Sequence, residues 1–348
     1  MEIADILRLP TSARAKLVQE IGNTPMQAIT LHIGEREQKI YLKMEGANPT
    51  GSMKDRTGFA LIQDLEAQGA LTEDSVLIES TSGNLGVALA FLCLVKGYRF
   101  VAVVDPKTTR ENITRMKALG AEVECVEQPD ETGGYLLSRL ARVQQLCRQS
   151  TRYIWANQYS NPANPRIHYI QTGPEIYAQL EEQVDAVFVP TSTGGTLAGI
   201  ARFFREVSST TRIIAVDAYG SVIFGAPAAP RKLTGIGSSQ HSIFLHAASY
   251  DTSLLIKDEE AFACCRALYA ATGLKVGGSS GAVLFACVRY LRDHPDLRQV
   301  VCVCADRGEN YATSIFNDEW LQRQGLRISW EHFKELQAGY YTMIERCE

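Results

Sequence analysis

Short apolar runs alternate along this chain with longer segments of helical periodicity, and this alternation restricts the fold more than any other feature. The runs are rich in β-branched residues and predict strands at Val76–Ser80, Phe100–Asp105, Glu122–Val126, Tyr153–Ala156, Ala186–Pro190, Ile213–Asp217 and Val300–Ala305. The helical periodicity predicts helices at Asn84–Lys96, Glu111–Leu119, Tyr135–Cys147, Gly195–Val207, Glu259–Ala271 and Ser280–Arg292. Strands joined by crossover helices form parallel sheets, so we expect an α/β protein.

Composition narrows the class of function. The chain has 348 residues, of which 45% are hydrophobic and 21% charged, enough for a large core. A net charge of −4, without a Lys/Arg-rich run, gives no reason to expect nucleic acid or a membrane as a partner. The nine cysteines lack the paired spacing of a disulfide framework or a zinc site. No signal peptide is recognisable, so we expect a cytoplasmic protein without a metal that acts on small molecules.

Ligands of parallel α/β proteins bind beyond the carboxyl ends of the strands, and the informative loops lie there. The loop Asn48–Arg56 contains a glycine turn and delivers Lys54 to the start of a helix. The positive helix end and partial burial both disfavour a charged ammonium and favour the free amine that forms a Schiff base with an aldehyde. A lysine within a Lys-Asp-Arg triplet is also commonly a solvated surface residue, and the loop alone leaves this alternative open.

Three further loops place Gly, Ser or Thr between a strand and a helix. Ser80–Gly86 offers hydroxyls and backbone N–H groups, which suit either a substrate carboxylate or a plain N-cap. Thr191–Gly199 has adjacent glycines that let amides approach a phosphate, although such turns are often only tight connections. It lacks the P-loop ending and the dinucleotide fingerprint. Val276–Gly281 sets serines before an apolar helix, where they serve as caps or contact a cofactor.

Taken together, these segments resemble the cysteine synthase family of fold-type II pyridoxal-phosphate enzymes over nearly the whole chain. The resemblance rests on eight motifs in order, namely IGNTP, NPTGSMKDR, TSGN, NQYSNPANP, TGGT, GIG, GGSSG and DRGENY. It implies a tryptophan synthase β-like fold of two α/β domains with mainly parallel sheets, and the Pro- and Asn-rich stretch 161–165 indicates their boundary. We expect residues 1–25 and 47–160 in the first domain, 26–46 and 161–326 in the second, and a helical extension over 327–348.

The resemblance also implies pyridoxal 5'-phosphate as the cofactor, amino acids as substrates and a homodimer. Lys54 is then the Schiff-base lysine that also removes the Cα proton, after which the β-substituent of an activated L-serine leaves and a nucleophile adds. The other implied cofactor contacts are Asn84 at the phenolic oxygen, Ser279 at the pyridine nitrogen, and Thr193, Gly194, Gly195 and Thr196 at the phosphate. The implied contacts of the substrate carboxylate are Thr81, Ser82, Gly83 and Gln158. The stretch Gly235–Gly237 is a candidate segment for movement over the substrate, and Gly235 is expected to contact it.

Several positions depart from ordinary cysteine synthases. Leu85 stands in place of Thr, Tyr159 in place of Phe and Ser192 in place of Gly, and the segment Pro129–Arg139 differs as well. These features resemble the siderophore branch of the family, which makes the 2,3-diaminopropionate precursor N-(2-amino-2-carboxyethyl)-L-glutamate from O-phospho-L-serine and L-glutamate. That branch implies that Arg139, Tyr159 and Ser192 line the substrate pocket.

A phosphoryl leaving group and a dicarboxylate nucleophile both call for a fixed cation, and an arginine at position 139 can bind either in bidentate fashion. Arginine at Leu-rich helical spacing is also typical of a solvated face. Two alternatives therefore stay open. The first is a cysteine synthase that uses O-acetylserine or O-phosphoserine with a sulfur nucleophile. The second is a catalytically idle relative that binds a partner, although the intact Lys54, Asn84 and Ser279 argue against it.

Overall fold

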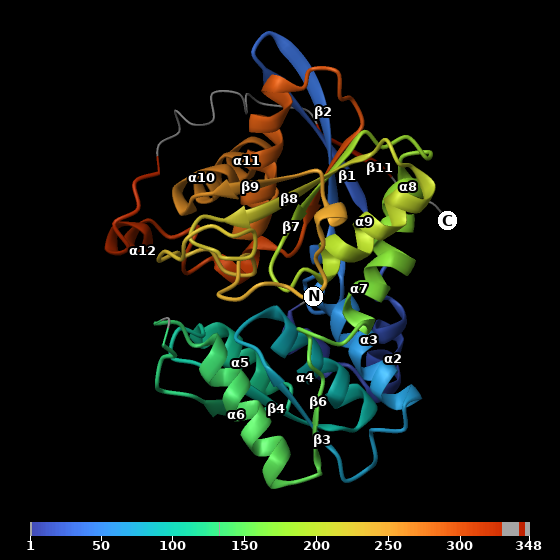
Figure 1. The fold of residues 1–348 in the computed structure, drawn as a ribbon, viewed down its shortest axis with the longest axis vertical. Coiled ribbons are helices and arrows are strands. Elements are labelled where there is room, and N and C mark those ends of the chain that lie inside the picture. The colour runs from blue at the N-terminus through green and yellow to red at the C-terminus, as the bar shows by residue number, and fades with distance from the viewer. Residues whose placement is uncertain (1, 132, 329–340, 345–348) are drawn as a thin grey trace. The chain divides into compact units, whose positions relative to one another are not determined.

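A computed structural model describes residues 2–131, 133–328 and 341–344 of the chain. The chain divides into two compact units, each made of two separate segments. Unit 1 comprises Met1–Ile21 and Asn48–Ile167, and unit 2 comprises Gly22–Ala47 and His168–Glu348. Each unit contains its own sheet with helices packed on it (Figure 1), and most strand pairs are parallel. The α/β class expected from the sequence is thereby confirmed. Among the described residues, no helix combines the length and apolar character needed to span a bilayer.

Unit 1 is built on a four-stranded parallel sheet of order β5-β4-β3-β6. Its strands are β3 (Val76–Ser80), β4 (Arg99–Val104), β5 (Glu122–Cys125) and β6 (Tyr153–Trp155). Its helices are α1 (Ile3–Arg8), α2 (Thr11–Gln19), α3 (Lys54–Ala67), α4 (Asn84–Lys96), α5 (Arg110–Ala118), α6 (Leu136–Gln149) and α7 (Ala163–Ile167). Strand β3 is buried along its whole length, because alternate residues pack into two apolar clusters, one with Leu77 and Phe91 and the other with Ile78 and Val143.

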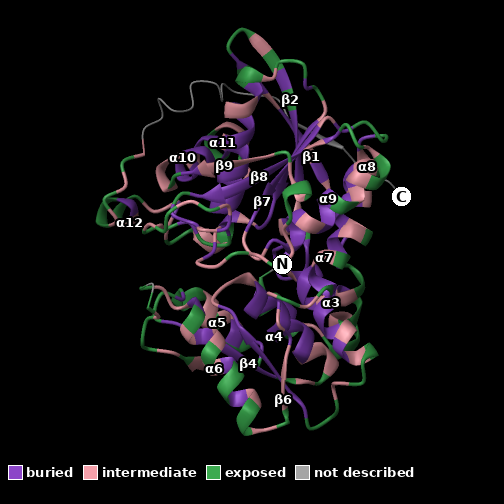
Figure 2. Ribbon diagram, in the orientation of Figure 1, coloured by how far each residue is buried: buried purple, intermediate pink, exposed green. Residues whose placement is uncertain are grey.

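Unit 2 holds a seven-stranded mixed sheet of order β11-β1-β2-β10-β7-β8-β9. Its strands are β1 (Met26–Ile33), β2 (Arg36–Met44), β7 (Ala186–Pro190), β8 (Arg212–Ala218), β9 (Thr252–Ile256), β10 (Val300–Cys304) and β11 (Tyr341–Ile344). Its α-helices are α8 (Gly173–Gln179), α9 (Gly195–Val207), α10 (Asp258–Thr272), α11 (Gly278–Asp293) and α12 (Asp318–Arg323). A π-helical turn, η2 (His168–Thr172), and the 3₁₀ turns η1 (Glu45–Ala47), η3 (Ala247–Ser249) and η4 (Gly308–Tyr311) complete it. The central strands are buried (Figure 2), and Phe188, Ile214 and Leu284 share one core cluster.

The sequence patterns anticipate most of these elements. Helices α4 and α9 have the predicted bounds, and the other predicted helices and strands agree within two residues at each end. Strands β1, β2 and β9 were not predicted. Of these, β2 carries Arg36, Glu37 and Lys39, and β9 is only partly buried. The apolar run that signals a strand buried on both faces is therefore missing from the first half of β2, and β9 is not buried in that way.

The helical extension expected after residue 326 is corrected in part. Residues Tyr341–Ile344 form the strand β11, which pairs antiparallel with β1 in the register Met26↔Ile344 to Ile29↔Tyr341. An edge strand such as β1 presents unpaired backbone N–H and C=O groups, and pairing with a further strand satisfies them. Residues 329–340 and 345–348, the rest of that predicted extension beyond 328, lie outside the described residues.

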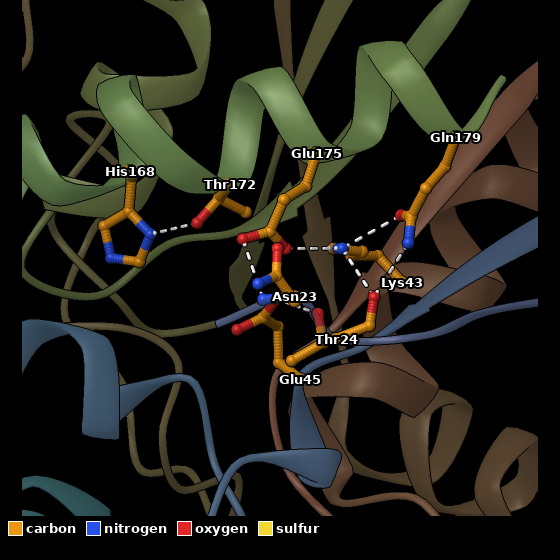
Figure 3. A network of polar contacts seen from close by, with 8 residues as sticks. All are labelled: Asn23, Thr24, Lys43, Glu45, His168, Thr172, Glu175 and Gln179. Carbon is orange, nitrogen blue, oxygen red and sulfur yellow. Dashed lines mark hydrogen bonds and ion pairs between the residues drawn. The ribbon is translucent and has the colours of Figure 1, made fainter. Parts of the chain in front are cut away.

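A fully buried lysine joins β2 to α8 in unit 2 (Figure 3). The Nζ atom of Lys43 lies 2.7 Å from Oε2 of Glu175 and donates further hydrogen bonds to the Thr24 carbonyl at 2.8 Å and to Oε1 of Gln179 at 2.9 Å. Oε1 of Glu175 accepts a hydrogen bond from the backbone N–H of Asn23 at 3.0 Å. An ammonium has three donors, and these three acceptors use all of them. The contacts therefore hold the turn before β1, strand β2 and helix α8 together.

We expect the substitution Lys43→Met to destabilise the protein by roughly 3 kcal/mol, because it leaves the largely buried carboxylate of Glu175 without its cation. Urea unfolding of the cofactor-free protein measures the change. Lys39→Met is the matched control, since Lys39 lies on the same strand but is exposed, and it should change stability by less than about 0.5 kcal/mol. Equal effects of the two substitutions would contradict a structural role for the buried pair.

Candidate active site

Lys54 is the first residue of α3, and the loop that leads to it is held from both sides. Asp55 is fully buried and accepts hydrogen bonds from the backbone N–H of Thr50 at 2.7 Å and from the Thr50 hydroxyl. Arg115 donates to the Thr50 carbonyl at 2.8 Å, and the Ser52 hydroxyl accepts from the Lys54 backbone N–H at 3.2 Å. The Lys54 side chain remains partly exposed. The fold therefore presents this amine at the N-terminus of a helix from a fixed loop.

The loop between β3 and α4 has the geometry of an anion site. Helix α4 begins at Asn84 after Gly83, and its first N–H groups have no acceptor inside the helix. The Thr81 N–H donates to the Val103 carbonyl at 3.0 Å, which fixes the loop against the neighbouring strand. Gly86 is required because a Cβ there would collide with the Met116 sulfur and with Thr81. Threonine and serine hydroxyls and helix-start amides thus come together in the short stretch Thr81–Asn84.

A buried carboxylate, that of Glu79, lies directly before this loop. Its Oε1 accepts hydrogen bonds from the Ser80 N–H at 2.8 Å and from Trp155 Nε1 at 3.3 Å, and its Oε2 accepts from the Gln158 N–H at 3.0 Å. Burial, opposed by these N–H donors and by Arg139, raises the pKa of Glu79 to about 7. The Gln158 side-chain amide donates to the Ser80 carbonyl at 3.0 Å. Gln158 is thus joined, through both its backbone and its side chain, to the end of β3 directly before the Thr81–Asn84 loop.

Arg139 faces into unit 1 from α6 and is only 8% exposed. Its Nε lies 3.2 Å from Oδ2 of Asp105, the residue after β4, and Nε finds no hydrogen-bond acceptor with good geometry among the described residues. A buried guanidinium whose Nε lacks a well-formed hydrogen bond can donate to a further anion. Loss of water raises the pKa of the nearby Tyr159 phenol to about 12, although the positive charge of Arg139 opposes the shift. Tyr159 is therefore neutral and able to donate a hydrogen bond at neutral pH.

The glycine loop of unit 2 follows β7 and starts α9. Gly194, the N-cap, has a φ of 87°, a left-handed conformation that favours glycine, and a Cβ there would collide with the Ser242 hydroxyl. Ser242 donates to the Thr193 carbonyl at 2.5 Å, and Ser192 donates to the Gly237 carbonyl at 3.2 Å. The first amides of α9 have no acceptor within the helix, as a phosphate group requires.

Thr196, in the first turn of α9, is held by a buried histidine. The Nε2 atom of His168 lies 3.2 Å from the Thr196 hydroxyl, and its Nδ1 lies 2.9 Å from the Thr172 hydroxyl. Figure 3 shows the contact between His168 and Thr172 within the π-helical turn. The π-helical turn therefore holds the Thr196 hydroxyl, which we expected from the sequence to contact a phosphate.

Ser279 is buried in the first turn of α11, the helix that follows the strand-like stretch at Val276. Glycine is needed at position 277, where a Cβ would collide with the carboxylate of Asp306. The Gly277 N–H donates to the Asp306 carbonyl at 3.2 Å, and the Tyr311 hydroxyl donates to Oδ2 of Asp306 at 2.6 Å. The DRGENY motif, which comes after α11 in the chain, thus fixes the start of that helix.

The structure therefore distributes the residues proposed from the sequence over the two units. Unit 1 carries Lys54, Thr81, Ser82, Gly83, Asn84, Arg139, Gln158 and Tyr159, and unit 2 carries Ser192, Thr193, Gly194, Gly195, Thr196, Gly235 and Ser279. Within unit 1, Gln158, Arg139 and Tyr159 all interact with Glu79. Sequence reasoning missed Glu79, Asp105 and His168. A signal for Glu79 was present, because an acid within the apolar run VLIES is unusual in a buried strand.

Comparison with known proteins finds one matching family and relatives that cover most of the chain. The family described as pyridoxal-phosphate dependent enzyme matches residues 17–306. Two relatives named N-(2-amino-2-carboxyethyl)-L-glutamate synthase, from Cupriavidus metallidurans and Ralstonia nicotianae, are each 40% identical to this chain. The matches cover 89% of this chain and 92% of the first relative, and 88% of this chain and 91% of the second. The crystal structure of an O-acetylserine dependent cystathionine beta-synthase from Helicobacter pylori is 31% identical, with a TM-score of 0.79, over 86% of this chain and 97% of that one.

The raised pKa of Glu79 predicts a pH dependence of stability. The folded protein holds this proton up to a pH of about 7, whereas a glutamate in the unfolded chain loses it near its ordinary pKa of 4.5. The free energy of unfolding should therefore fall as pH rises from about 4.5 to about 7 and then level off, with a contribution on the order of 3 kcal/mol. Urea unfolding of cofactor-free wild type and Glu79→Gln over this range measures it. Burial also raises the pKa of Asp217, to about 6, and this contribution is common to both proteins. Identical pH slopes would refute the assignment.

Proposed function

The chain belongs to the family of pyridoxal-phosphate-dependent enzymes, and on this basis we propose that it makes N-(2-amino-2-carboxyethyl)-L-glutamate and phosphate from O-phospho-L-serine and L-glutamate. The observation that carries the proposal is the 40% identity, over nearly nine tenths of this chain, to two relatives that bear this product's name. The coarser activity, a β-replacement on a serine derivative, is common to the proposal and to its main alternative. In this reaction the bond from Cβ to the phosphate oxygen breaks, and a bond from Cβ to the glutamate nitrogen forms as that nitrogen loses a proton.

The loops described above suit pyridoxal phosphate. We propose that the Lys54 amine would form the Schiff base and that the amides and hydroxyls of Thr193–Thr196 would hold the phosphate. The left-handed Gly194 and the first amides of α9, which have no acceptor within the helix, provide donors for it. Asn84 at the phenolic oxygen and Ser279 at the ring nitrogen complete the proposed contacts. When bound, the cofactor withdraws electrons from the Cα of the amino acid. The task of Lys54 is then to accept the Cα proton.

The Thr81–Asn84 loop and Gln158 suit the carboxylate of the amino-acid substrate. Hydroxyls of Thr81 and Ser82 and the amides near Gly83 lie at a helix start, where a negative charge is stabilised. Gly235 has a φ of 75° and belongs to the segment that bonds to the glycine loop through Gly237. We propose that this segment moves over the substrate and keeps water away from the reacting Cβ.

The choice of phosphate and glutamate is supported by Arg139. Its guanidinium is buried, and its Nε atom has an anionic neighbour at 3.2 Å but no well-formed hydrogen bond. A phosphate dianion or a second carboxylate is a suitable partner for the remaining donors of such a group. Tyr159, neutral at physiological pH, and Ser192 are further proposed polar contacts of the substrate.

Cysteine synthesis is the second candidate. The likeness to a solved structure named an O-acetylserine dependent cystathionine beta-synthase favours the O-acetylserine on which this candidate would act. Acetate and sulfide do not require a buried arginine, however, and this counts against it. A mass-spectrometric screen of phosphoserine or acetylserine with glutamate or sulfide separates the two candidates. Formation of the glutamate adduct from phosphoserine supports our proposal, and faster turnover of acetylserine with sulfide would replace it.

Lys54→Ala should abolish turnover and remove the visible absorbance of the bound cofactor that depends on the Schiff base. Borohydride reduction of the wild-type holoprotein followed by peptide mapping identifies the modified lysine. The modified peptide should contain Lys54, because its amine lies at a helix N-terminus on a fixed loop. Lys96→Ala is the control, since Lys96 is the last residue of α4 and forms an ion pair with Glu66. A reduced peptide that lacks Lys54 would overturn the assignment.

Arg139→Ala should raise the KM for phosphoserine or glutamate by roughly tenfold to a hundredfold, the effect of losing a hydrogen bond to a charged group, and leave the cofactor absorbance unchanged. Arg142→Ala is the matched control, because Arg142 lies on the same helix and pairs with Glu124 near the surface. Steady-state kinetics with each substrate varied in turn measure the effect. If both substitutions leave both KM values unchanged, Arg139 does not contact a substrate.

A further inference from the structure

Glu79 is the residue through which the ends of two parallel strands are joined in unit 1. It lies in β3, is fully buried and accepts three N–H hydrogen bonds, from Ser80 on its own strand, from Trp155 on β6 and from Gln158 after β6. Each oxygen has at least one donor at 3.0 Å or less. The carboxylate therefore fixes the relative position of the carboxyl ends of β3 and β6.

The segments that it fixes are those proposed to bind the substrate carboxylate. Ser80 leads directly into Thr81 and Ser82, and Gln158 donates its side-chain amide to the Ser80 carbonyl at 3.0 Å. The Asn164 side chain donates to the Gln158 carbonyl at 2.8 Å, and Asn157 adopts a left-handed φ of 53°. Gln158 is thus held in a strained turn by bonds on both of its backbone polar groups.

The charges around Glu79 come from each element packed against it. Helix α6 contributes the cation Arg139 and the thiol of Cys147, the end of β4 contributes Asp105, and the segment after β6 contributes the phenol of Tyr159. Arg139 is thus the cation that faces two carboxylates, and its Nε lies 3.2 Å from Asp105. Protonation of Glu79 converts one of its oxygens from an acceptor to a donor, and the N–H group opposite that oxygen then loses its partner.

We propose that Glu79 is a positioning residue for the substrate, whose ionised carboxylate holds the Thr81–Gly83 loop and Gln158 in the arrangement that receives the carboxylate of the incoming amino acid. The inference rests on the proposed function and deepens it. Glu79 is called a positioning residue because it acts through the loop and Gln158 and does not itself contact substrate or cofactor. The ionised form binds substrate better than the protonated form. Substrate affinity therefore falls as pH is lowered through about 7, the pKa of the free enzyme's Glu79.

The test compares wild type, Glu79→Gln and Glu122→Gln as holoproteins. Glutamine has the shape of glutamate but only one acceptor oxygen, so one of the bound N–H groups is left without a partner. Glu122 is the control, since it lies on β5 of the same sheet with a largely exposed side chain paired with Arg99. Binding of L-serine is followed by the change in cofactor absorbance from pH 6 to pH 8.5. L-serine serves as the probe because it lacks the phosphate that titrates near pH 6.

We expect Glu79→Gln to bind L-serine roughly tenfold more weakly at pH 8.5 and to lack the fall in affinity that wild type and Glu122→Gln share below pH 7. Ionisation of the ligand and of the cofactor is the same in all three proteins, so the difference in pH profile belongs to Glu79. Hydrogen exchange of the cofactor-free proteins provides an independent measurement. The amides of Ser80 and Gln158 should exchange faster in Glu79→Gln than in Glu122→Gln.

Equal affinities and pH profiles in the three proteins would overturn the role of Glu79 and leave the proposed function intact. A wild-type holoprotein that gives no spectral response to L-serine or phosphoserine would overturn both. If Glu79→Gln does not fold, Glu79→Asp takes its place, because it keeps the charge but does not reach all three donors. Binding by Glu79→Asp as tight as that of wild type would contradict the proposal.

Discussion

Parallel strands end at one edge of their sheet, and this constraint organises both units of the protein. A strand buried on both faces has to stop before it can expose polar side chains, and the helix that follows starts with N–H groups that lack acceptors. The loops after β3 and β7 are of this kind, and they lead into α4 and α9 with glycine at the N-cap of each. Anion-binding groups are therefore a direct product of the fold, although the N-cap glycines differ in conformation, with a φ of −138° at Gly83 and a left-handed φ of 87° at Gly194.

Buried charged side chains connect the strands and helices in both units, but they are hydrogen-bonded to different extents. In unit 2 the Lys43 ammonium is matched by three acceptors, so its charge is fully used in joining β2 to α8. In unit 1 the match is incomplete, because Arg139 faces both Asp105 and Glu79 while its Nε lacks a well-formed hydrogen bond. A satisfied buried charge stabilises a fold, whereas an incompletely satisfied one is suited to binding and to titration near neutral pH. This contrast distinguishes the structural network of Figure 3 from the cluster around Glu79.

The elements that could be predicted are those with a local signal. The bounds of α4 and α9 follow from helical periodicity next to glycine loops, and β3 and β7 follow from apolar β-branched runs. Strands β1 and β2 were not predicted because they are held by cross-strand pairing, and β2 also carries the charged residues Arg36, Glu37 and Lys39. The strand β11 pairs with the edge of β1, more than three hundred residues earlier in the chain, whereas the sequence around residues 341–344 was interpreted as helical. For the candidate site, the sequence predicted the loops and helix starts that follow the strands, but it did not predict the partners that hold them.

The sequence alone determined the α/β class, the positions of the glycine loops and the placement of Lys54 at a helix start, since periodicity and turn chemistry are local properties of the chain. The tertiary structure alone decided which charges are buried and which groups face them. Glu79 meets Gln158 across 79 residues and Lys43 meets Glu175 across 132. Because the cost of removing a charge from water depends on every group around it, the pKa of Glu79 near 7 and the burial of Arg139 become visible only when distant segments pack together.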